Sequence, residues 1–190
     1  MSPYSRKLYT RTGDDGTTGL FHGGRVGKDA PGPAAYGDDD EAVSALGVSR
    51  ALTDGGSELH ELLLRLQREL FVAGAELATE PAKRDRLEPG VSQVTPEMVA
   101  ALEPVIDDVT TRFDPPQEFV VPGENALAAA LDLARTVVRR AERQAVAARG
   151  AGWLDDSQVV PYVNRLADLV YTLARWQEHG SRPVRTDNRT

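Results

Sequence analysis

Apolar residues recur with a helical period along most of the chain after residue 38. The clearest case is 58–77, where leucines and other apolar residues return every three or four positions, as on the buried side of an amphipathic helix. Ser57 precedes this segment as an N-cap, and Pro81 follows it as a stop. The pattern predicts a long helix with one face against the core.

The same period predicts four further helices. They are expected at 38–54, 95–113, 122–149 and 157–178. Asp38 and Glu41 open the first of them at the spacing of a capping box. Five amphipathic helices with short connections predict an all-α fold, a five-helix bundle. We divide the single domain into an irregular N-terminal loop region (1–37), the helical bundle (38–178) and a flexible tail (179–190).

The stretch Thr10–Leu20 has no helical or strand period and is rich in glycine, threonine and aspartate. Glycines such as Gly13 and Gly16 permit positive φ, so that backbone amides can converge on an anion. Threonine hydroxyls and the Asp14 carboxylate can supply oxygen ligands to a phosphate-bound Mg²⁺. A glycine-rich turn without a ligand is the alternative interpretation.

Three arginines recur every four positions in the helix predicted at 122–149. Arg135, Arg139 and Arg143 therefore share one face, with Glu142 beside them. Carboxylates of a partner helix or a polyphosphate could neutralise them, and a solvated basic face is the alternative. Asn164 flanks the apolar stripe of the last helix, either as a hydrogen-bonding group in a cleft or as a residue satisfied between helices.

Composition excludes several classes of protein. A net charge of −7 argues against a general nucleic-acid binder, and the absence of cysteine excludes disulfides and cysteine-based zinc sites. No stretch resembles a signal peptide or a membrane span, which predicts a cytoplasmic protein. The chain has no Walker P-loop, no Glu-x-x-His pair for a di-metal bundle and no Asp-x-His-x-x-Gly loop of a cobalamin carrier.

Taken in order, these motifs resemble the PduO-type ATP:cob(I)alamin adenosyltransferases over nearly the whole chain. The matching stretches are Tyr9–Leu20, Arg25–Asp29, Ala35–Glu41, Gln67–Ala78, Phe119–Gly123, Ala134–Arg143 and Asn164–Arg175. The resemblance implies a homotrimer with active sites between subunits. It also implies transfer of the 5′-deoxyadenosyl group of ATP to cob(I)alamin, giving adenosylcobalamin and inorganic triphosphate.

The resemblance assigns roles to residues by matching position. The triphosphate and its Mg²⁺ would be held by Thr10, Arg11, Thr12, Gly13, Asp14, Gly16, Thr17 and Lys28. Arg139 would contact the phosphates, and Glu142, Arg143 and Asn164 would complete the nucleotide site. Asp40 would pair across the subunit interface with Arg135. Phe119 would lie against the lower face of the corrin ring, displace the axial base and leave Co(II) four-coordinate.

Two departures from the family pattern bear on affinity. Asp15 stands where many relatives have lysine, which removes a phosphate partner, and Pro122–Asn125 replaces a more common Pro-Gly-Gly loop. The implied partners are a flavoprotein reductase that delivers Co(I) and an enzyme that accepts adenosylcobalamin. A helical-bundle protein that binds corrinoid or nucleotide without catalysis is the alternative function.

Overall fold

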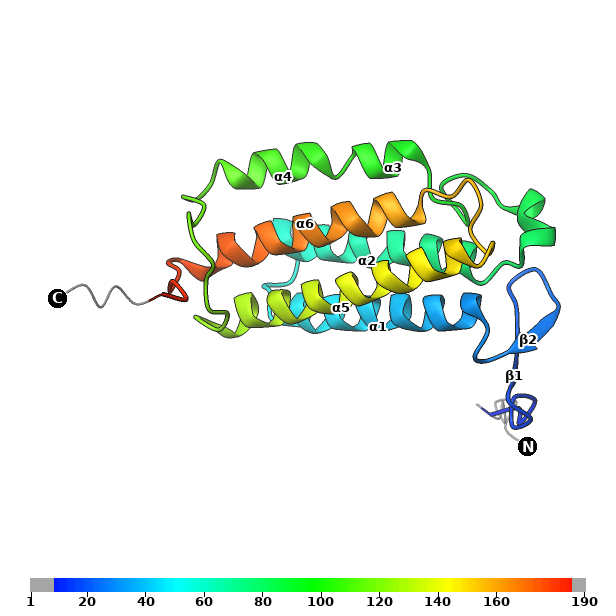
Figure 1. Cartoon of the computed structure of the whole chain (residues 1–190). Coiled ribbons are helices and arrows are strands. Elements are labelled where there is room, and N and C mark those ends of the chain that lie inside the picture. The colour runs from blue at the N-terminus through cyan, green and yellow to red at the C-terminus, as the bar shows by residue number, and fades with distance from the viewer. Residues whose placement is uncertain (1–8, 186–190) are drawn as a thin grey trace, which may run out of the picture.

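The computed structural model describes residues 9–185, and helices make up most of this range (Figure 1). The all-α prediction is confirmed. In order, the elements are β1 (Thr17–Gly19), β2 (Arg25–Gly27), α1 (Pro31–Ala51), α2 (Glu58–Leu77), a 3₁₀ turn (Pro81–Arg86), α3 (Pro96–Ala100), α4 (Glu103–Thr110), α5 (Ala126–Gly150) and α6 (Val159–Glu178).

Four long helices enclose the core. α1 packs against both α2 and α5, α5 packs against α6, and α4 lies along α6 (Figure 1). The apolar stripe of α2 faces inward as predicted, since Leu63, Leu66 and Leu70 have no exposed surface. Burial of such side chains, at about 25 cal/mol per Å² of apolar surface, is the main force that holds the bundle together.

The helix predicted at 95–113 is divided into α3 and α4. The division lies just before Pro104, in the first turn of α4. Proline has no amide hydrogen to donate to the carbonyl of Ala100, and its ring would clash with that carbonyl in a continuous helix. The structure therefore has six α-helices among its described residues, where five were predicted.

The first helix begins at Pro31, seven residues before its predicted start at Asp38. Proline is well suited to the first helical position because its missing amide would have no intrahelical partner. Gly32 packs so closely on Trp153 that an added Cβ would lie 2.3 Å from the indole ring. The predicted capping box is therefore wrong: Asp38 and Glu41 lie inside α1 and pair with Arg140 of α5.

A short antiparallel hairpin interrupts the N-terminal region, where no strand was predicted. Thr17 pairs with Gly27, and Gly19 pairs with Arg25. At the other terminus, part of the predicted flexible tail is held by backbone hydrogen bonds. The Val121 amide donates to the Arg182 carbonyl, and the Val184 amide to the Phe119 carbonyl, both at 2.8 Å. Residues 186–190 of that tail lie outside the described range.

The hairpin and the segment around Phe119 lie at opposite ends of the bundle. The hairpin adjoins the start of α1, whereas residues 119–125 adjoin the start of α5 and the end of α6 (Figure 1). A helix of 20 residues is about 30 Å long, so this separation is roughly the length of the bundle. None of the helices in residues 9–185 is both long and apolar enough to cross a membrane.

Candidate functional site

The glycine-rich loop folds back on itself around Lys28. Arg11 and Gly16 adopt positive φ, of 61° and 83°. The Lys28 amide donates to the Gly16 carbonyl at 2.9 Å, and its ammonium donates to the Gly13 carbonyl at 2.8 Å. Among residues 9–185, Lys28 forms no ion pair and the Gly13 amide has no acceptor. An ammonium beside a free amide suits an anion.

Arg25 is a second cation of this loop that the predicted site residues did not include. From β2 it donates to the Thr17 hydroxyl at 2.6 Å and to the Thr12 carbonyl. The Thr10 and Thr12 hydroxyls lie 2.9 Å apart. The sequence includes Arg25 only in a matching stretch, because the approach of Arg25 to Thr12 depends on strand pairing that the sequence pattern does not predict.

Asp15 is built into the turn of the loop. Its Oδ1 accepts hydrogen bonds from the Thr17 amide at 2.9 Å and from the Thr17 hydroxyl at 2.7 Å. These bonds, and the charge of Arg25, lower the pKa of Asp15, which is therefore ionised at neutral pH. Arg25 lies 3.9 Å away and offsets part of the repulsion that Asp15 would exert on a phosphate.

The predicted cluster on α5 and α6 is assembled around Glu142. This carboxylate accepts a hydrogen bond from Arg139 at 2.6 Å through Oε2, and one from the Asn164 amide at 2.9 Å through Oε1. Arg143 donates to the Arg139 carbonyl at 3.0 Å. The Arg139 side chain remains 46% exposed. The cluster therefore presents an oriented guanidinium with donors left for an anion.

Asp40 and Arg135 do not pair within one chain. Asp40 is exposed on α1 and forms no ion pair with any described residue. Arg135 lies 3.7 Å from Asp132 on its own helix, and its guanidinium lies 5.9 Å from the centre of the Tyr171 ring. The structure thus leaves the Asp40 carboxylate available to a group outside this chain.

An apolar groove of about 460 Å³ lies beside Asp40, between α1 and α2. Phe21, Tyr36 and Phe71 line it, and Phe21 and Phe71 are 57% and 64% exposed. The Tyr36 hydroxyl lies 3.4 Å from that of Thr18 in β1, so the groove adjoins the hairpin. Exposed aromatic side chains around an apolar hollow indicate a surface that a ligand or another chain covers.

Phe119 lies far from this groove and is 88% exposed. Its backbone is fixed by the pairing with residues 182–184, and an ion pair of 2.8 Å between Arg182 and Glu124 closes the same loop. Asn125 caps α5 by accepting from the Ala128 amide, and it donates to the Gln177 carbonyl at 2.6 Å. The loop at 122–125 is therefore anchored to α6, and it presents Phe119 outward.

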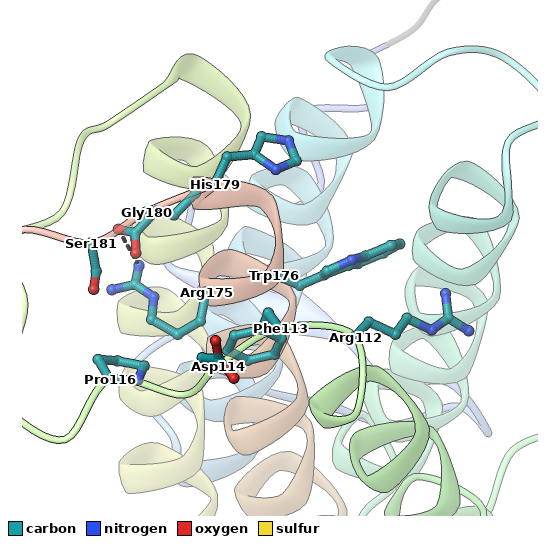
Figure 2. Close-up of a pocket in the computed structure, with 10 residues that line it drawn as sticks. Arg112, Phe113, Asp114, Pro116, Arg175, Trp176, His179, Gly180 and Ser181 are labelled. Carbon is teal, nitrogen blue, oxygen red and sulfur yellow. Dashed lines mark ion pairs between the residues drawn. The ribbon is translucent and has the colours of Figure 1, made fainter.

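Arg175 belongs to the last matching stretch, and in the structure it is a buried arginine that neutralises two carboxylates. Its side chain is 2% exposed and pairs with Asp132 and, at 3.1 Å, with Glu178. Figure 2 shows Arg175 in the wall of a pocket at the end of α6, with Trp176 and Arg112 on the other side. Burial raises the pKa of Glu178, and the charge of Arg175 opposes that rise.

Replacing Arg175 with alanine is expected to destabilise the fold by about 3–5 kcal/mol, because buried Glu178 would lose its counter-charge and Asp132 would keep only Arg135, at 3.7 Å. Urea unfolding measures the loss. Arg165→Ala is the matched control on the same helix: Arg165 is 37% exposed in its pairs with Glu103 and Asp168, and it should cost less than about 1 kcal/mol. Equal losses from the two variants would contradict a buried structural role for Arg175.

Known proteins match this chain over nearly its whole length. A family model described as cobalamin adenosyltransferase matches residues 8–177. The corrinoid adenosyltransferase of Citrobacter freundii is 42% identical over 172 residues, 90% of this chain and 95% of the relative. That of Mycobacterium tuberculosis (strain H37Rv) is 40% identical over 177 residues, 92% of this chain and 90% of the relative.

Solved structures agree with these relatives. A phenylalanine-to-alanine variant of the PduO-type ATP:corrinoid adenosyltransferase from Lactobacillus reuteri, complexed with cobalamin and ATP, superposes with a TM-score of 0.81. It is 33% identical and covers 95% of this chain and 100% of its own. An arginine-to-lysine variant from the same organism, complexed with ATP, has a TM-score of 0.79 at 30% identity, with coverage of 94% and 100%.

Proposed function

The chain belongs to the cobalamin adenosyltransferase family, and from this premise we propose that it transfers the 5′-deoxyadenosyl group of ATP to cob(I)alamin. One observation carries the assignment: the chain matches, over 95% of its length, a relative solved with both cobalamin and ATP. In the reaction, an electron pair of Co(I) forms the cobalt–carbon bond to C5′ of the ribose. The C5′–O bond breaks, and its electrons leave with inorganic triphosphate.

The protein contributes position and charge to this displacement, and it needs no side-chain nucleophile or base. Residues 10–17 and Lys28 hold the triphosphate. The proposal is supported by the Lys28 ammonium, which donates to the Gly13 carbonyl and forms no ion pair among residues 9–185. It is also supported by the Gly13 amide, which has no acceptor in that range. Mg²⁺ fits the exposed oxygen donors of Thr10, Thr12 and Asp14, and it would neutralise part of the phosphate charge.

Arg139 binds the leaving triphosphate, and Glu142 holds it in place. A guanidinium oriented by a carboxylate keeps its remaining donors aimed in one direction, so little reorganisation is needed as negative charge develops on the leaving group. Asn164 binds the nucleotide next to it, with Arg143 completing the cationic face. The contacts of Glu142 with both Arg139 and Asn164 support this assignment.

The complete site lies between subunits of a homotrimer. Within one chain the loop and Phe119 are at opposite ends of the bundle (Figure 1), and Asp40 and Arg135 have no contact with each other. A second copy can bring its Phe119 and Arg135 to the loop and Asp40 of the first. The corrin ring then lies against the apolar groove beside Phe21 and Phe71, with the partner's phenylalanine below it.

The reaction also requires two partner enzymes, one before it and one after it. Cob(II)alamin must gain one electron before it can act as a nucleophile, which a flavoprotein reductase can supply, and adenosylcobalamin must pass to an enzyme that uses it. Phe119 displaces the axial base of the cobalt. Without that base, the orbital that accepts the electron lies lower in energy, so the reduction becomes easier. We expect the reduction, the adenosyl transfer and the delivery of adenosylcobalamin to take place in the cytoplasm.

The proposal is tested by the fate of the phosphates. ATP labelled with ³²P at the γ position should yield intact labelled triphosphate in amounts equal to the adenosylcobalamin formed. Recovery of labelled orthophosphate or pyrophosphate as the primary product would contradict displacement at C5′. Tight binding of ATP and cobalamin with no product at all would favour a binding protein without catalysis.

A further inference from the structure

Asp39 is a buried acid in the wall of the groove between α1 and α2. It is 3% exposed, and its side chain makes no hydrogen bond or ion pair with any residue in 9–185. Its Oδ1 is fully shielded. Its Oδ2 lies against Gly74 of α2, where an added Cβ would come within 3.0 Å of it. A buried polar group without a partner is costly, and such groups call for an explanation.

The surroundings of Asp39 disfavour the charged form of its carboxyl. Asp40, on its own helix, adds a negative charge, and Tyr162 of α6 lies near enough for the Asp39 carboxyl to raise the pKa of the tyrosine. The Tyr162 hydroxyl of α6 donates a hydrogen bond to the Glu69 carboxylate at 2.8 Å, and Arg65 forms an ion pair with the same carboxylate at 3.6 Å. Among residues 9–185, no cation pairs with Asp39. Burial first, and the Asp40 charge second, raise the pKa of Asp39 well above its usual value.

A neutral carboxyl group carries an O–H donor, and an O–H donor in an apolar wall is satisfied only by an acceptor that enters the groove. The corrin ring of cobalamin bears amide side chains around its rim, whose carbonyl oxygens are such acceptors. We propose that Asp39 is a specificity-determining residue for the corrinoid, donating a hydrogen bond from its protonated carboxyl to a rim amide carbonyl. This inference rests on the proposed function.

The test compares Asp39→Asn, which keeps a donor of similar shape, with Asp39→Leu, which removes it. Asp54→Asn is the matched control, since Asp54 is an exposed acid in the turn after α1. The dissociation constant of cob(II)alamin is measured spectroscopically in the presence of ATP. Asp39→Leu should weaken corrinoid binding about tenfold, and the other two variants should stay within about twofold. ATP affinity should be unchanged in all three.

The pH profile separates this role from mere packing. Corrinoid binding favours the protonated form of Asp39, so affinity should be constant below the pKa of Asp39 in the free protein. It should fall as pH rises through that pKa, because a carboxylate cannot donate and would place a charge in the groove. Asp39→Asn should lose this fall in affinity, while Asp54→Asn should keep it.

Two results would overturn the proposal: wild-type corrinoid affinity in Asp39→Leu, or an unchanged pH profile in Asp39→Asn. Thermal unfolding verifies that both variants fold, which is expected because neither leaves a buried charge. The profile of Asp39→Asn decides the matter if the leucine variant does not fold. If the wild type binds ATP but neither binds nor adenosylates corrinoid, both proposals fail. If it is active and Asp39→Leu matches it, only the role of Asp39 fails.

Discussion

Arg139→Ala is expected to lower kcat/KM for adenosyl transfer by about 10²- to 10³-fold, the usual effect of removing a group that stabilises charge on a leaving oxygen. In the structure Glu142 orients the Arg139 guanidinium at 2.6 Å and is itself held by Asn164. The alanine variant loses a positive charge at the triphosphate and leaves Glu142 there as an additional negative one. Both changes disfavour the departure of a polyanion.

The control for this variant is Arg149→Ala. Arg149 is an exposed arginine in the last turn of the same helix, and it forms no ion pair among residues 9–185. It should retain wild-type activity. Arg139→Lys should fall between the two, because an ammonium keeps the charge and loses the forked geometry. Light scattering reports the oligomer, and dissociation of the assembly by Arg139→Ala would show that Arg139 acts at the interface instead of on phosphate.

Complementation between two inactive variants is the second large effect. Lys28→Ala removes a cation of the phosphate loop, and Phe119→Ala removes the exposed ring at the other end of the bundle. Each variant alone should be at least tenfold less active. Lys28→Ala loses a charge at the triphosphate, and Phe119→Ala loses the roughly 1.5–3 kcal/mol that the ring contributes once the corrin covers it, where tenfold corresponds to about 1.36 kcal/mol. Assemblies made by co-expressing the two should recover activity, because some sites combine an intact loop with an intact Phe119.

Random assembly makes this recovery quantitative. A site that takes its loop from one subunit and its phenylalanine from the next is intact in about a quarter of cases in a one-to-one mixture. Co-expression of Lys28→Ala with Arg25→Ala is the matched control, since both residues contact the same loop and no loop would then be intact. Recovery in the control, or none in the Lys28 and Phe119 pair, would exclude a site shared in this way.

The bundle was largely predictable because helix periodicity is a local property. The leucines of α2 are buried as their spacing predicts, and the helix expected at 122–149 is α5, with Asn125 as its N-cap. The errors come from prolines and from tertiary contacts. Pro31 begins a helix where a connection was expected, and Pro104 divides a helix that was expected to be continuous. Asp38 and Glu41 pair with Arg140, which no local pattern could predict.

In the candidate site, too, local spacing was predictable and tertiary contacts were not. Helical spacing placed Glu142 beside Arg139, and the structure adds that Asn164 reaches the same carboxylate from α6. Arg25 and Asp39 could not be singled out, because the contacts of Arg25 arise from strand pairing and the isolation of Asp39 from the packing of α1 on α2. The roles of Phe119, Asp40 and Arg135 stay predictions, since one chain brings neither Phe119 to the loop nor Arg135 to Asp40.

The most direct test of the central claim is an anaerobic assay with chemically reduced cob(I)alamin, ATP and Mg²⁺, followed by the absorbance change to adenosylcobalamin. Conversion should require both the protein and ATP, and one triphosphate should be released for each cobalamin adenosylated. Unchanged cob(I)alamin in the presence of folded protein and bound ATP would contradict the proposed adenosyl transfer.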